Sequence, residues 1–242
     1  MRTDLELQVA VAKVSKYAVS ESGDTVEVIE RPHGGLSLVM VDGQRSGKSA
    51  KAISNMVARK AVSLLGDGVR DGAAARAAHD YLRTMRSGQV SATLNIVSVD
   101  LDTLTLVISR NSHCPVVVLR GSEGELQLLD EPSQAVGIHA RTRPVIAEIP
   151  IVENLHVVLF TDGVLAAGER YGQQLDAPAF VRDQLAFCPR ETCARSLADA
   201  LLARAVELDQ GRPGDDITVV TVSVVALEQL DGVRRVSVRF PI

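Results

Sequence analysis

Strand-like segments in this sequence come in runs that are interrupted by pairs of helical segments, and this order limits the possible folds. Short stretches rich in β-branched residues occupy the beginning, the middle and the end of the chain. Apolar residues at helical spacing occur in two separate pairs of segments. Because strand and helix do not alternate regularly, the order predicts an α+β layered fold with mostly antiparallel sheets.

The spacing of apolar residues places the expected elements. Helices are predicted at Ser49–Leu65, Ala73–Met85, Ala177–Leu185 and Cys193–Leu208. Strands are predicted in the segments LELQVAVAKV, VEVIE, LSLVMV, SATLNIVSVD, TLTLVISR, VVVLR, ELQLL, VIAEIPI, LHVVLFTD, ITVVTVSVV and, near the end, RRVSVRF. The run LSLVMV is almost continuously apolar, as is typical of a buried strand.

Length and composition limit the class of protein. The 242 residues contain 46% apolar and 23% charged residues, which fits one globular domain over residues 1–242. A net charge of -4 disfavours nucleic acid as the main partner. The sequence contains neither a signal peptide nor an apolar stretch near the roughly 20 residues that span a bilayer, so we expect a cytoplasmic protein without a membrane partner.

Acidic residues stand at the ends of three predicted buried strands. Asp42 closes LSLVMV, Asp162 closes LHVVLFT, and Asp215 and Asp216 open ITVVTV. If these strand ends meet, their like charges need a cation or protons. Carboxylates, the Gly43 carbonyl and water are hard ligands that select Mg²⁺ or Mn²⁺. Two such ions can activate water for phosphate ester hydrolysis.

Four motifs in one order carry a family resemblance. Ser-Gly-Asp ends at Asp24, VDG spans Val41 to Gly43, FTDG spans Phe160 to Gly163, and GDDITVV begins at Gly214. This set resembles the metal-dependent type 2C serine/threonine protein phosphatases, and within them the bacterial branch named after the stage II sporulation phosphatase. The resemblance implies a four-layer αββα sandwich with two central, mostly antiparallel sheets flanked by helices.

The resemblance also implies roles for individual residues. Asp42 would bridge two metal ions, and the Gly43 carbonyl would bind one of them. Asp162 and Asp215 would hold the second ion.

The remaining acidic residues have supporting roles by the same resemblance. Asp24 would contact a metal-bound water, although Ser-Gly-Asp is also a good turn sequence. Either Asp215 or Asp216 would be the direct metal ligand. The family motif favours Asp215, and Asp216 would then support the site without contacting the metal.

Two segments depart from the branch pattern. The loop DGQRSG has Gln44 and Arg45 where the branch commonly has a Met-Gly type of loop, and NSHCP only partly matches the Asn-Ala-Gly-His-Pro type of segment. His113 lies in this second segment and could approach the active site. Arg45 and Lys48 could hold a phosphorylated substrate, or belong to a solvated helix start.

The implied function is hydrolysis of phosphoserine or phosphothreonine on a protein by a metal-activated water, with two Mn²⁺ or Mg²⁺ ions. Relatives in this branch act on anti-sigma factor antagonists or related scaffold proteins in bacterial partner-switching signalling. An alternative is a catalytically inactive module of the same fold that binds a phosphoprotein. A nucleotide-binding ATPase is the least supported alternative, because only three residues separate Gly43 and Gly47 where a P-loop needs four. The sequence does not indicate an oligomeric state.

Overall fold

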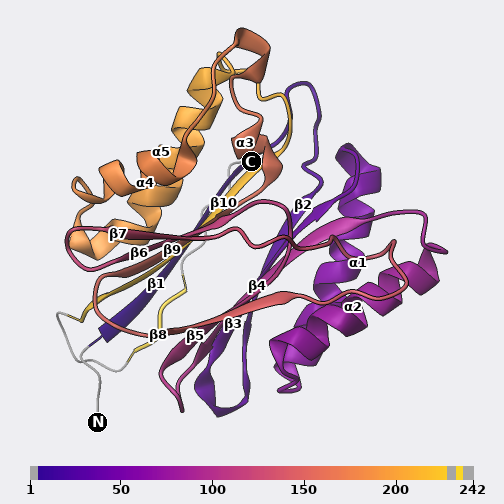
Figure 1. The fold of residues 1–242 in the computed structure, drawn as a ribbon, viewed down its shortest axis with the longest axis horizontal. Coiled ribbons are helices and arrows are strands. Elements are labelled where there is room, and N and C mark those ends of the chain that lie inside the picture. Colours follow the sequence, from indigo (N-terminus) through magenta and orange to yellow (C-terminus); the bar gives the residue numbers. More distant parts are fainter. Residues whose placement is uncertain (1–4, 228–232, 237–242) are drawn as a thin grey trace.

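Two antiparallel sheets form the centre of the molecule (Figure 1). The computed structural model describes residues 5–227 and 233–236, and within them each sheet has five strands. The first sheet has the order β1-β10-β9-β6-β7, with strands β1 (Leu5–Val14), β6 (Val116–Arg120), β7 (Glu125–Leu129), β9 (Leu155–Phe160) and β10 (Ile217–Ala226). The second has the order β2-β3-β4-β5-β8, with strands β2 (Asp24–Glu30), β3 (Leu36–Gly43), β4 (Ala92–Asp100), β5 (Thr105–Asn111) and β8 (Val145–Pro150).

Helices cover the outer face of each sheet (Figure 1). α1 (Gly47–Gly66) packs on β2 and β3, with α2 (Asp71–Met85) beside it, and α5 (Cys193–Leu208) packs on β1 and β10, with α4 (Ala177–Leu185) beside it. The shorter elements are α3 (Asp162–Leu165), η1 (Pro32–Gly34), η2 (Glu169–Tyr171) and η3 (Arg190–Thr192). The expected α+β sandwich of four layers is therefore confirmed. No helix in the described ranges is both long and apolar enough to cross a bilayer.

The strand β3 shows why the central strands are continuously apolar. Leu38 and Met40 point into the core between the two sheets, while Val39 and Val41 point into the core beneath α1 and α2. Successive side chains of a strand face opposite sides, so a strand between two apolar layers has no polar face. Each such side chain contributes about 1.5–3 kcal/mol when fully buried.

The predicted helices and strands agree with the structure except at two places. Asp162 is the first residue of α3 rather than the last residue of a strand. In the predicted strand RRVSVRF, Arg234 to Val236 have no strand structure, and the other residues lie outside the described ranges.

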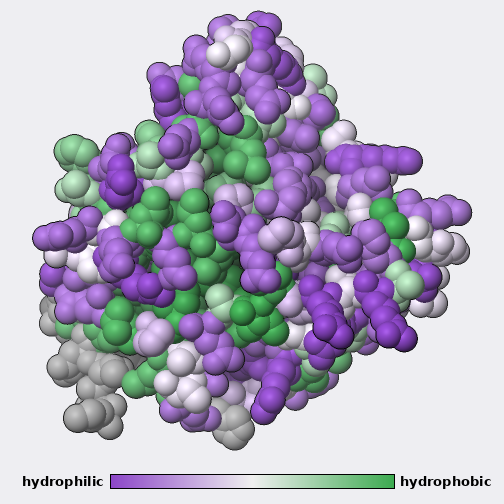
Figure 2. Space-filling view, in the orientation of Figure 1, coloured by the Kyte–Doolittle hydropathy of each residue, from purple (hydrophilic) through white to green (hydrophobic). Residues whose placement is uncertain are grey.

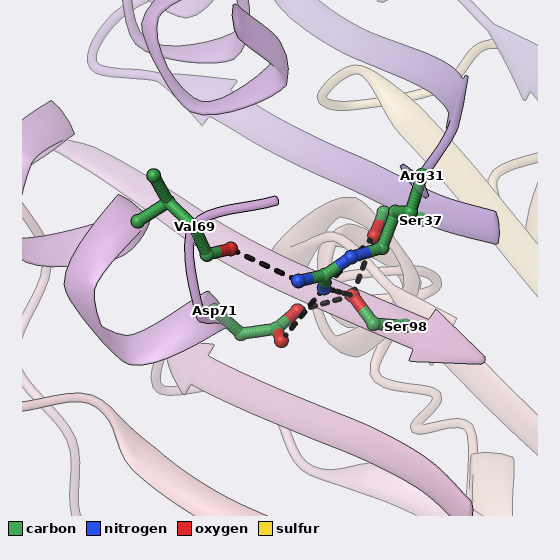
Figure 3. A network of polar contacts seen from close by, with 5 residues as sticks. All are labelled: Arg31, Ser37, Val69, Asp71 and Ser98. Carbon is green, nitrogen blue, oxygen red and sulfur yellow. Dashed lines mark hydrogen bonds and ion pairs between the residues drawn. The ribbon is translucent and has the colours of Figure 1, made fainter. Parts of the chain in front are cut away.

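A buried polar network fixes the connection between α1 and α2 to the second sheet (Figure 3). The Arg31 guanidinium, just after β2, donates to the Asp71 carboxylate at 3.0 Å, to the Val69 carbonyl at 3.0 Å and to the Ser98 hydroxyl at 3.1 Å. Ser98 also donates to Asp71 and shares a 2.6 Å hydrogen bond with Ser37. Because these groups are largely removed from water, the network depends on all its members.

Candidate functional site

The candidate site begins with two carboxyl groups on neighbouring strands. Asp24, the first residue of β2, is paired directly with Asp42 near the end of β3. Residues opposite each other in an antiparallel pair project from the same face, with Cβ atoms about 4.5–5.5 Å apart. The register of this hairpin therefore places two acidic side chains side by side.

Two threonines of the other sheet connect to this pair. The Thr218 hydroxyl donates to Asp24 Oδ2 at 2.6 Å, and the Thr161 hydroxyl donates to the same oxygen at 3.2 Å. Thr161 directly precedes Asp162, and Thr218 lies three residues after Asp215. These contacts between the sheets bring the remaining carboxylates toward the first two, at the end of the sandwich where α3 lies (Figure 1).

Burial and the charges of neighbouring carboxylates raise the pKa values of Asp24, Asp42 and Asp162. Burial, followed by the charges of Asp24, Asp162 and Asp215, raises the pKa of Asp42 to about 9. Burial is also the main cause that raises the pKa of Asp24 to about 6, and burial with the Asp215 charge raises the pKa of Asp162. The structure therefore brings Asp24, Asp42, Asp162 and Asp215 into one electrostatic cluster.

Two glycines allow the backbone to close around this cluster. A Cβ at Gly43 would collide with the Ala50 carbonyl in the first turn of α1, and a Cβ at Gly163 would collide with the Asp216 carbonyl. Each Asp-Gly pair therefore packs the loop of an acidic residue directly against a neighbouring element. This close approach explains why glycine follows both Asp42 and Asp162.

Asp215 and Asp216 have different surroundings. Asp216 is 5% exposed, and its carboxylate accepts hydrogen bonds from the Lys16 amide at 2.9 Å and the Gly23 amide at 2.8 Å. Asp215 is less buried, and its Oδ1 accepts a hydrogen bond from the Asp216 amide at 2.9 Å. Asp216 thus holds the β1–β2 loop, while Asp215 keeps Oδ2 outside hydrogen bonds to described residues.

The donor set fits a hard divalent cation. Asp24 Oδ1 is buried and meets no hydrogen-bond donor among the described residues, which leaves a carboxylate oxygen of the residue opposite Asp42 without compensation. In the described ranges, no three His, Cys, Asp or Glu side chains converge into a ready-made metal site. A cation would offset the repulsion that raises the pKa values of these carboxyls. The fit therefore rests on their chemistry, with Asp42, Asp162, Asp215 and the Gly43 carbonyl as candidate ligands.

Two lysines that the sequence analysis did not identify contact the site. Lys13 at the end of β1 and Lys51 in α1 each place Nζ 2.6 Å from the Asp24 carbonyl oxygen. Burial, followed by the nearby Lys51 charge, lowers the pKa of Lys13 to about 8. The signal for Lys51 was its position in the first turns of the helix after Asp-Gly, whereas no local pattern marks Lys13.

The residues of the divergent segments take different positions. His113 Nε2 lies 3.8 Å from Asp162 Oδ2, so this loop reaches the cluster. Gln44 fixes its own loop to β4 through two hydrogen bonds with the backbone of Ser91. Arg45 and Lys48 are exposed and form no ion pair within the described part of the chain.

Comparison with known families identifies a match that covers most of the chain. The family model of the stage II sporulation protein E (SpoIIE) matches residues 32–225. No curated protein sequence matches the chain.

Solved structures share the fold at low sequence identity. The PP2C phosphatase domain with a fragment of the regulatory domain of SpoIIE from Bacillus subtilis is 17% identical, with a TM-score of 0.78. That match covers 91% of this chain and 64% of the other, so this chain spans less than two thirds of that structure.

Two further structures contain metal ions. RsbX in complex with magnesium is 14% identical with a TM-score of 0.67, and the match covers 90% of this chain and 95% of RsbX. The catalytic domain of the serine/threonine phosphatase PstP in complex with 2 manganese ions is 17% identical with a TM-score of 0.65, covering 91% and 99%.

Proposed function

The chain belongs to the stage II sporulation protein E family, and from this premise we propose that it is a metal-dependent serine/threonine protein phosphatase. The observation that carries the proposal is the cluster of Asp24, Asp42, Asp162 and Asp215, in which burial and neighbouring carboxylate charges raise the pKa of Asp24, Asp42 and Asp162. Burying several carboxylates together lowers the stability of the fold unless a bound cation offsets their charge. Residues 1–242 would form one phosphatase domain.

The candidate ligands are Asp42, the Gly43 carbonyl, Asp162 and Asp215. Two Mn²⁺ or Mg²⁺ ions would supply a water nucleophile at neutral pH and offset the charge of the phosphoryl oxygens. The chain itself fixes the geometry. The Thr161 and Thr218 hydroxyls orient the Asp24 carboxylate, whose other oxygen would accept a hydrogen bond from the attacking water.

The proposed substrate is a phosphoserine or phosphothreonine on a protein of partner-switching signalling, similar to an anti-sigma factor antagonist. The family supports this class of substrate, together with the likeness to SpoIIE and RsbX. The exposed His113 and Asp162 side chains, 60% and 43% accessible, leave the cluster open to a group on the surface of a partner. A phosphorylated side chain on a folded protein requires such an open site.

A hydrolysis assay tests the proposal. p-Nitrophenyl phosphate and a phosphoserine peptide are incubated with Mn²⁺, Mg²⁺ or a chelator, using the wild type and Asp42→Asn. We expect metal-dependent turnover that the substitution abolishes. Calorimetric titration with Mn²⁺ and with the phosphopeptide is the parallel measurement. Binding of both without turnover would contradict the proposed enzymatic activity and support the inactive binding module instead.

A further inference from the structure

A polar cavity lies beside the candidate site, in the connection between β7 and β8. Its volume is about 500 Å³, and it is lined by Pro132, Ser133, Gln134, Arg141, Thr142 and Arg143. We call it the arginine pocket. Arg141 and Arg143 are exposed on either side of the buried Thr142, and neither forms an ion pair within the described residues.

The walls of the arginine pocket are held by the end of β5. Asn111 Nδ2 donates to the Gln134 carbonyl at 2.8 Å and to the Thr142 hydroxyl at 3.0 Å, and so connects both walls. The Ser133 hydroxyl donates to the Arg110 carbonyl at 2.6 Å. Since these hydrogen bonds are buried or partly buried, they hold the two walls of the pocket in fixed positions.

Strand pairing sets the distance from the pocket to the carboxylate cluster. Gly43 of β3 pairs with Ala92 of β4, and on its other side Ala92 bridges to Val136. The pairing of β4 with β5 stops at Leu94 and Asn111, so Val136 takes the neighbouring place that β5 leaves. Two strand spacings of about 4.8 Å put Val136 about 10 Å from Gly43, and Gln134 of the pocket wall is two residues away from Val136, so the pocket lies about 10–17 Å from the loop after Asp42.

The surroundings of the pocket are basic on one side. Arg83 of α2 borders Ile138, since both lie within 4 Å of the position of a Cβ on Gly88. Hydrophilic residues predominate on the right of Figure 2, where Figure 1 shows α2 and the β7–β8 connection. Asp130 and Glu131 directly precede Pro132 on the other wall, so the positive charge of the pocket lies on the wall formed by Arg141 and Arg143.

We propose that the arginine pocket binds an acidic segment of the protein substrate while the phosphorylated residue lies in the carboxylate cluster. The inference rests on the proposed function and adds a substrate preference to it. An extended peptide advances about 3.3 Å per residue, so about three to five residues span this distance. The preferred substrate therefore has Asp or Glu three to five positions from the phosphoserine. A nucleic acid fits less well, because no aromatic side chain lines the pocket for base stacking.

Peptide kinetics test the preference. Four phosphoserine peptides carry either Glu or Gln at the third to fifth positions, on the N-terminal or the C-terminal side of the phosphoserine. The variant Arg141→Glu/Arg143→Glu is compared with Arg195→Glu/Arg204→Glu, which changes the net charge equally on α5 at the opposite face. We expect the pocket variant to raise KM for one Glu peptide by at least about fivefold, and the control variant to leave it unchanged. Hydrolysis of p-nitrophenyl phosphate should be unaffected in both.

Direct binding separates this inference from the proposed activity. Fluorescence anisotropy of a labelled Glu-rich peptide is measured on the metal-free protein, in which no turnover is needed. Weaker binding to the pocket variant alone, and at higher salt, is the expected result. Equal binding to both variants, equal KM values for Glu and Gln peptides, or stronger binding of a single-stranded oligonucleotide would overturn it. If p-nitrophenyl phosphate is not hydrolysed, the proposed function fails while the binding result still decides whether the pocket holds an acidic segment.

Discussion

Asp24 and Asp42 lie directly opposite each other on β2 and β3, and the Asp24 carboxylate is at the same time held by hydroxyls from the other sheet. One residue therefore connects the hairpin that carries Asp42 to the strands that precede Asp162 and follow Asp215. The consequence is a cluster whose geometry depends on the packing of the two sheets. Changes to its charge should affect activity and stability in opposite directions.

Replacing Asp42 by Asn should separate these two effects. Asn needs neither a buried charge nor the uptake of a proton on folding, so the metal-free protein should gain about 1–3 kcal/mol of stability at pH 8 to 9. Phosphatase activity should fall by at least about 100-fold, because a proposed metal ligand would be lost. Thermal unfolding and p-nitrophenyl phosphate hydrolysis measure the two quantities on one preparation. Unchanged activity would remove Asp42 from the proposed ligands.

The stability of the metal-free protein should fall as pH rises. The folded-state pKa values of Asp24 and Asp42, about 6 and about 9, lie above the ordinary value of 3.8, so the folded protein binds more protons than the unfolded chain. Their contribution is fully present below about pH 4 and is lost as pH passes 6 and then 9. Unfolding in urea between pH 5 and 9 should show this slope, and saturating Mn²⁺ should reduce it. A stability that rises over this range in the metal-free protein would contradict the burial of these carboxyls.

Replacing Gly43 by Ala should damage the site through the backbone. The added methyl group would collide with the Ala50 carbonyl, so α1 must move away from β3 at a cost of about 2–4 kcal/mol. Gly66→Ala at the end of the same helix is the matched control, because its Cβ would meet nothing closer than 3.5 Å. We expect the control to be neutral or slightly stabilising. Equal unfolding midpoints in urea for the two variants would show that the contact with α1 does not constrain the loop that begins at Gly43.

Asp215 and Asp216 should respond differently to substitution. Asp216→Ala leaves the Lys16 and Gly23 amides without their acceptor, so stability should fall by about 2–4 kcal/mol. Asp215→Asn should instead weaken Mn²⁺ binding and change stability by less than about 1 kcal/mol. Calorimetric titration with Mn²⁺, together with thermal unfolding, distinguishes the two roles. The reverse pattern would make Asp216 the ligand.

The Arg31 network should contribute strongly to stability. Arg31→Met leaves the Asp71 carboxylate, 8% exposed, without its ion-pair partner, and a loss of about 3–5 kcal/mol is expected. The control is Arg195→Met, because the exposed ion pair of Arg195 with Asp199 at 3.3 Å should be worth less than about 1 kcal/mol. Urea unfolding measures both. Similar losses in the two variants would mean that the network is solvated.

Much of the fold was predictable because the local patterns are strong. The run LSLVMV gave β3, and the spacing from Ala50 to Leu65 gave α1, since burial on two faces or on one face leaves a distinct periodicity. The short helix α3 at Asp162 was not predicted, because four residues are too few to show a helical period. The acidic residues at the strand ends were found by position, and their roles as metal ligands remain predictions.

The sequence by itself determined the layered α+β class, the order of its elements and the family motifs, because each depends on residues close together along the chain. Only the tertiary structure decided that Lys13 and Lys51 meet at the Asp24 carbonyl, that Asp216 serves the β1–β2 loop, and that Asn111 holds the arginine pocket. These contacts join residues up to 200 positions apart. Their partners are set by how the two sheets pack and by strand register, and neither leaves a local pattern in the sequence.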